Sequence, residues 1–128
     1  MSLLLDTHAL IWWFLDAPPL SPAARAAIAT ASEPILVSAA SAFEISTKVR
    51  IGKLPQAAAL DDAFEDFLAV QRFVHLPISV RHARRAGALP IPHCDPFDRL
   101  LIAQALVEGL TLVSNEAAFD GFGVRRLW

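Results

Sequence analysis

The chain has 128 residues, of which 55% are hydrophobic, so it fits one domain with its own core and is not disordered. A lone cysteine excludes an internal disulfide, and the longest apolar run, Ala9 to Leu15, is too short to span a bilayer. The net charge of −2 neither requires nor excludes a nucleic-acid partner. Since the N-terminus lacks the basic lead-in of a signal peptide, we expect a cytoplasmic protein with no membrane contact.

Short apolar runs alternate with helical segments along the whole chain. In order, the patterns predict a strand at 3–5, a helix at 8–16, a helix from 22 to about 31, a strand at 35–38, and helices at 39–52 and about 60–72. The second half continues with a strand at 73–76, a helix at 80–87, a proline-marked loop, a helix at 97–108, and strands at 110–113 and 124–128. Ser21 before Pro22 predicts a helix start, and Gly52 and Gly109 predict helix ends.

Strands separated by helices imply crossover connections, and crossover connections imply parallel pairing. We therefore predict one α/β domain over residues 1–128, with a mainly parallel central sheet of about four to five strands flanked by helices. Ligands of such folds bind beyond the carboxyl ends of the strands. The residues that directly follow each apolar run are therefore the candidates for function.

Acidic residues recur at those positions. They are Asp6 after the first strand, Glu44 in the helix after the second, Asp95 and Asp98 at the start of the helix at 97–108, and Glu116 after the strand at 110–113. Parallel topology brings all of them to one edge of the sheet, where their charges repel one another. A hard divalent cation with oxygen ligands is the natural counter-charge for such a cluster.

Each acid also has an ordinary structural explanation. Asp6 can cap the following helix, and Asp95 followed by Pro96 can begin the next one with Asp98 in its first turn. Glu44 completes a capping box with Ser41, or pairs with Lys48 one helical turn later. Glu116 can begin a short helix. Taken singly, these explanations are favoured for every acid except Asp6, and only the whole set indicates a site.

Four segments carry a resemblance to a known family. In chain order they read LLLDTHALIWW, VSAASAFEISTKVRIGKL, DPFDRLLIAQA and TLVSNEAAF. Together they resemble a PIN-domain ribonuclease, and within that family a VapC-like toxin of a toxin–antitoxin pair, over essentially the whole chain. The resemblance implies a parallel α/β sheet, Mg²⁺ or Mn²⁺ as cofactor, RNA as substrate and a VapB-like antitoxin as partner.

The resemblance also assigns roles to residues. The family's metal-site acids fall on Asp6, Glu44 and Asp98, and Glu116 stands where the family usually has Asp, so its contact with metal is expected directly or through water. The neighbouring residues Thr7, Asp95, Ser114 and Asn115 are expected to support these four carboxylates. With the metal, Asp6, Glu44, Asp98 and Glu116 form the expected catalytic set.

Two further surfaces are predicted. Lys48, Arg50 and Arg99 follow Glu44 and Asp98 closely, so we expect them to contact RNA phosphates. The segment at 8–15 is apolar nearly all round, so Trp12, Trp13 and Phe14 are expected to bind the antitoxin unless neighbouring helices bury them. A homodimer is also expected, and part of the same surface is available to it.

Other functions have less support from the sequence. No phosphate-binding glycine loop is present, and His93 beside Cys94 lacks the flanking signature of a cysteine enzyme. The main alternative is a PIN scaffold that no longer cleaves and serves as a module for binding protein or RNA. The retained acids count against that alternative.

Overall fold

The computed structural model describes residues 1–90, 92 and 95–128. The strands are β1 Leu3–Leu5, β2 Ile35–Ser38, β3 Val74–Leu76, β4 Thr111–Val113 and β5 Arg125–Leu127. The helices are α1 Thr7–Leu15, α2 Pro22–Ala29, α3 Ala39–Arg50, α4 Ala58–Asp62, α5 Phe64–Gln71, α6 Val80–Ala88 and α7 Pro96–Glu108, with 3-10 helices η1 Pro55–Ala57 and η2 Ala117–Phe122. Within the described residues, no helix combines the length and apolar character needed to cross a membrane.

The strands form one parallel sheet in the order β3-β2-β1-β4-β5. The first strand in the sequence is therefore the central one, with Leu4 opposite Leu36 of β2 on one side and Leu112 of β4 on the other. This confirms the predicted α/β class and its parallel sheet. The carboxyl ends of β1, β2 and β4 consequently meet at one edge.

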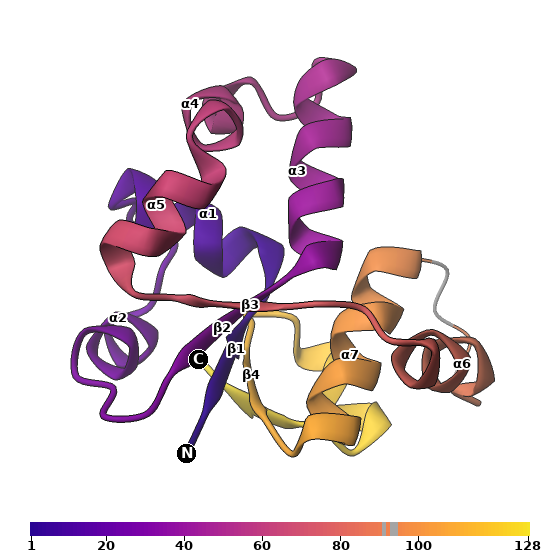
Figure 1. Ribbon diagram of the computed structural model, residues 1–128. Helices are drawn as coiled ribbons and strands as arrows, with labels where there is room; N and C mark the ends of the chain where they lie inside the picture. Colours follow the sequence, from indigo (N-terminus) through magenta and orange to yellow (C-terminus); the bar gives the residue numbers. More distant parts are fainter. Residues whose placement is uncertain (91, 93–94) are drawn as a thin grey trace.

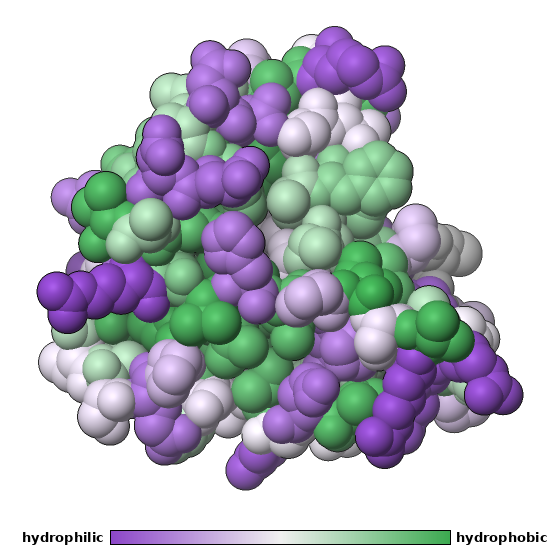
Figure 2. Space-filling view, viewed as in Figure 1, coloured by the Kyte–Doolittle hydropathy of each residue, from purple (hydrophilic) through white to green (hydrophobic). Residues whose placement is uncertain are grey.

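Helices cover both faces of this sheet (Figure 1). Leu3 and Leu5 share a buried cluster with apolar residues of α1 to α5, whereas Leu4 points the other way into a cluster with Leu101 and Ile102 of α7. The alternation follows from the two-residue period of a strand. Hydrophilic side chains are prominent over α6 at the lower right of Figure 2, and Arg81, Arg84 and Arg85 of that helix are exposed.

Several helix boundaries follow the predicted signals. The side chain of Asp95 accepts hydrogen bonds from the backbone N–H groups of Phe97 and Asp98, Pro96 is the first residue of α7, and Gly109 ends the helix at φ 67°. A left-handed φ of this kind favours glycine because other residues carry a Cβ. Ser21 caps α2 in the predicted way.

Two predictions about helices were wrong. The helix expected at 60–72 is two helices, α4 and α5, separated at Ala63, whose φ of −120° is not helical. The capping box, one of the two structural explanations offered for Glu44, does not form, because α3 already begins at Ala39 with Ser38 as its N-cap; the alternative pair with Lys48 does form. Glu44 therefore lies within the helix, one turn and more from its start. The helix also ends earlier than expected, at Arg50, with Gly52 in the left-handed region just beyond it.

Candidate metal and nuclease site

A small cavity of about 90 Å³ lies at the carboxyl edge of the sheet. Its lining consists of Asp6, His8, Glu44, Lys48, Asp95, Asp98, Asn115, Glu116 and Phe119. All five acids singled out from the sequence are in this set. The topology explains the meeting: Asp6 follows β1, Glu116 follows β4 by three residues, and α3 and α7 bring the other three.

Asp6 links the sheet to α1. Its side chain is 6% exposed and accepts a 2.8 Å hydrogen bond from the backbone N–H of Ala9, which makes it the N-cap of the helix. Burial raises the pKa of Asp6, and the charge of Glu44 adds to that shift, while a hydrogen bond with the Ser114 side chain acts in the opposite direction. Asp6 therefore caps α1 and also lines the cavity, so the structural and the functional explanation of this residue are compatible.

Glu44 is almost fully buried, with 3% of its surface exposed. Thr7 Oγ1 donates a 2.6 Å hydrogen bond to Glu44 Oε1, and Lys48 Nζ pairs with Glu44 Oε2 from the next turn of α3. Both carboxylate oxygens therefore have a partner within the protein. The predicted orienting role of Thr7 agrees with this geometry.

Asp98 shows the electrostatic cost of the cluster most clearly. The pKa of Asp98 is raised from 3.8 to about 7, and burial is the largest cause. The further contributions, in decreasing order, come from the negative charges of Asp95, Glu44, Asp6 and Glu116. A nearby cation would favour the ionised form of Asp98.

Ser114 connects two of the acids. It is completely buried at the end of β4, and its Oγ accepts a 3.1 Å hydrogen bond from the backbone N–H of Glu116. The same hydroxyl hydrogen-bonds the Asp6 carboxylate. Glu116 is exposed and stands at the N-terminal end of η2, so the short helix allowed for from the sequence does form there.

The donor chemistry of this cavity fits a hard divalent cation, because five carboxylates line one small space and repel one another. The placement of the side chains is less favourable. Within the described part of the chain, no three His, Cys, Asp or Glu side chains are arranged so that they could hold one metal ion. Internal partners of Asp6 and Glu44 contribute to this, since they engage oxygens that a metal would use.

The three cations predicted to contact RNA lie in different surroundings. Lys48 lines the cavity and pairs with Glu44, while Arg50 is exposed at the C-terminal end of α3. Arg99 points to the protein itself: its Nε donates to the Ala86 carbonyl at 3.0 Å and its Nη2 to the Leu89 carbonyl at 2.7 Å. Arg99 thereby ties the start of α7 to the end of α6, and its contact with RNA stays a prediction.

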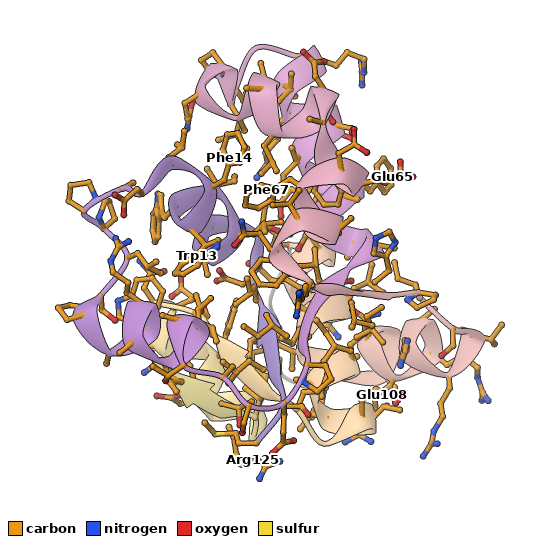
Figure 3. The ribbon with its side chains drawn as sticks, turned by 60° about the vertical axis from the view of Figure 1, so that its left-hand side comes forward. Trp13, Phe14, Glu65, Phe67, Glu108 and Arg125 are labelled. Carbon is orange, nitrogen blue, oxygen red and sulfur yellow. The ribbon has the colours of Figure 1, made fainter. Side chains whose placement is uncertain are left out.

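The aromatic residues of α1 are half-buried against their own chain. Phe14 and Phe67 of α5 meet edge to face with ring centroids 5.0 Å apart, and Figure 3 shows the two rings between their helices, with Trp13 nearby on α1. Trp13 Nε1 donates a 3.0 Å hydrogen bond to Gln71, and Trp12 packs beside Trp128. Their role in partner binding stays a prediction.

Some residues of the site were not singled out from the sequence. His8 and Phe119 line the cavity, and neither was among the residues predicted for the site. The position of His8, two residues after Asp6 at the start of a helix, was the available signal. Outside the cavity lining, Ser38 at the end of β2 and Gln104 of α7 form a buried side-chain hydrogen bond that no local pattern indicated. His93 and Cys94 lie outside the described residues.

Comparisons with known proteins agree with this architecture. A family model described as the PIN domain matches residues 3–124. The chain is 34% identical over 116 residues to Ribonuclease VapC22 of Mycobacterium tuberculosis, covering 90% of this chain and 87% of that protein. The family-model match spans all the segments that carry the acidic residues.

Solved structures show the same fold at lower identity. One is VapBC2 of Rickettsia felis bound to a DNA fragment from its promoter, with a TM-score of 0.70, 17% identity and coverage of 98% of this chain and 97% of that one. Another is VapC20 of Mycobacterium tuberculosis, described as a toxin that cleaves the sarcin-ricin loop, with a TM-score of 0.69, 12% identity and 95% coverage of both chains.

Proposed function

Because this chain belongs to the PIN-domain family, we propose that it is a metal-dependent endoribonuclease and the toxin of a toxin–antitoxin pair. The observation that carries the proposal is the single cavity lined by Asp6, Glu44, Asp98 and Glu116. The named relative, a ribonuclease at 34% identity, supports RNA as the substrate. The VapBC structures among the neighbours support a VapB-like antitoxin as partner.

The protein groups have distinct tasks in this proposal. Asp6, Glu44 and Asp98 hold Mg²⁺ or Mn²⁺ directly, and Glu116 does so directly or through water. When bound, the ion supplies activation of water near neutral pH and stabilisation of the charge that develops on the phosphate. Thr7 orients Glu44 through its hydroxyl, Ser114 orients Asp6, and Asp95 holds the start of α7 so that Asp98 faces the cavity.

The proposal also covers the residues that contact RNA, the surface that binds the antitoxin, and the oligomeric state. Lys48, Arg50 and Arg99 are the proposed phosphate contacts, with Asn115 beside Glu116 as a supporting polar group. The antitoxin is proposed to bind along α1, over Trp12, Trp13 and Phe14. We further propose that the protein acts in the cytoplasm as a homodimer.

The direct test is cleavage of structured RNAs with and without Mg²⁺ or Mn²⁺, with Asp6→Asn as control. We expect cleavage only with the wild-type chain and a divalent ion. Cleavage that persists in excess chelator, or in the Asp6→Asn chain, would remove the metal site from the mechanism.

An inactive scaffold is the competing function, and one observation favours it: the acids of the described residues are not arranged as a metal-holding group. Calorimetry with Mn²⁺ separates the two functions. An endoribonuclease of this kind binds Mn²⁺ in the cavity, and the binding weakens in Asp98→Asn. A scaffold that has lost its chemistry shows no such binding.

A further inference from the structure

The acidic cavity already contains a cation that belongs to the protein. Lys48 lines the cavity together with the carboxylates, and its Nζ pairs with Oε2 of the buried Glu44. Among the described lining residues it is the only lysine or arginine. The hydrogen bond to Glu44 raises the pKa of Lys48, and the charges of Asp95 and Asp98 add to that shift. The positive charge of Lys48 therefore interacts favourably with Asp95 and Asp98 as well as with Glu44.

This pairing has a physical reason. A carboxylate as buried as Glu44 is costly unless a counter-charge and hydrogen bonds compensate it. Thr7 supplies a hydrogen bond to Oε1, and Lys48 supplies the charge at Oε2. If Thr7 keeps its hydrogen bond to Oε1, a metal ion has to approach Glu44 at Oε2. Oε2 is the oxygen that Lys48 contacts in this structure.

We propose that Lys48 is a resident counter-ion that competes with the divalent metal for Glu44, so that metal binding displaces the Lys48 ammonium from Oε2. The inference rests on the metal-binding part of the proposed function. The competition is electrostatic: an ammonium and a divalent cation repel each other strongly at the same carboxylate oxygen, so the ion has to displace Lys48 from Oε2. Lys48 is a positioning residue in this scheme and sets the metal affinity of the site.

The side chain of Lys48 is suited to such an exchange. It is 30% exposed, whereas the Glu44 side chain is 4% exposed, so the ammonium can turn toward water while the carboxylate stays in place. A lysine reaches its partner through a flexible four-carbon stem and donates as a compact point charge. Thr7 holds the orientation of Glu44 during the exchange, so only one contact has to break.

The test is titration of the full chain with Mn²⁺ alone in a calorimeter. We expect Lys48→Met to bind Mn²⁺ about tenfold more tightly than wild type, because the competing charge a few ångströms from the ion is gone. Lys53→Met is the matched control, since it removes the same charge from an exposed lysine that does not line the cavity, and it should stay within about twofold of wild type. Lys48→Arg keeps the charge and should remain near wild type.

A double-mutant cycle isolates the competition itself. In an Glu44→Gln background the ammonium has no carboxylate to hold, so Lys48→Met should change the Mn²⁺ affinity much less than in the wild-type background. If Lys48→Met alone unfolds, Lys48→Gln takes its place in the cycle, because its amide can still donate a hydrogen bond to Oε2 while it carries no charge. The proposal is overturned if Lys48→Met binds Mn²⁺ no more tightly than wild type, or if Lys53→Met tightens it equally. Because the readout is metal affinity, a chain that binds Mn²⁺ in this pattern but cleaves no RNA would contradict the proposed function alone.

Discussion

The carboxylate of Asp6 accepts a 2.8 Å hydrogen bond from the backbone N–H of Ala9, so an acid of the cavity is also the residue that begins α1. Loss of function after Asp6→Ala would therefore mix the loss of a helix cap with the loss of a charge. Asparagine caps helices about as well as aspartate, so Asp6→Asn changes mainly the charge.

The first prediction uses this difference. Asp6→Asn and Asp98→Asn should each lower RNA cleavage by orders of magnitude while the far-ultraviolet circular dichroism stays native, because each removes negative charge from the metal site. Asp62→Asn is a matched control: it removes the charge of an exposed aspartate that does not line the cavity and should retain most of the activity. Unchanged cleavage by Asp6→Asn or Asp98→Asn at limiting Mg²⁺ would exclude that residue from the site.

The second prediction concerns stabilisation by metal. Mg²⁺ or Mn²⁺ should raise the melting temperature, since the ion binds the folded chain and the unfolded chain has no assembled site. Asp98→Asn should reduce that rise. Melting curves that stay the same at millimolar excess of both ions would mean that the folded chain has no site for them.

The third prediction concerns pH in the presence of a chelator. Between about pH 4 and pH 7 the folded protein keeps a proton on Asp98 that the unfolded chain has lost, so the free energy of unfolding should fall as the pH rises. Above about pH 7 both states are ionised and the loss is complete. Melting temperatures from pH 5 to pH 8 should fall less steeply for Asp98→Asn, with a residual slope from Asp6, whose pKa is also raised. Parallel curves for the two proteins would contradict the assignment.

The fourth prediction concerns the electrostatic contribution to RNA binding. In an Asp6→Asn background that does not cleave, neutralising Lys48 or Arg50 should flatten the salt dependence of RNA binding by roughly one unit of slope each. Lys53→Met serves as the control. Arg99→Met should also lower the melting temperature, because its guanidinium ties α7 to the carbonyls of Ala86 and Leu89. Slopes equal to wild type would place the RNA on another surface.

The fifth prediction concerns the antitoxin. Trp12→Ala or Trp13→Ala should weaken antitoxin binding by more than about 2 kcal/mol, as interface anchors do, without abolishing cleavage. Trp13→Ala also loses the hydrogen bond to Gln71, so its melting temperature has to be measured beside its affinity. If both variants bind the antitoxin as tightly as wild type, these tryptophans belong to the core or to a contact between copies.

The sequence predicted the parts of this fold that depend on local signals. Asp95 with Pro96 and Gly109 defined both ends of α7, and the acids after the strands pointed to one edge of the sheet. The break at Ala63 was not predictable, because neither glycine nor proline marks it. The sequence left open whether Glu44 has a structural or a functional role. The structure shows that Glu44 both pairs with Lys48 and lines the cavity, which no local pattern could indicate.

The central position of β1 has a consequence for synthesis of the chain. Leu3–Leu5 leave the ribosome before the other strands of the sheet, yet their neighbours are Ile35–Val37 and the much later Thr111–Val113. Contacts so distant in sequence form late in folding, and an apolar strand waiting for its neighbours is exposed to aggregation. The cavity itself is completed only when Glu116 and Phe119, which follow β4, have been made. A nascent chain released before that point lacks one wall of the cavity, so a truncated translation product should be harmless to the RNA around it.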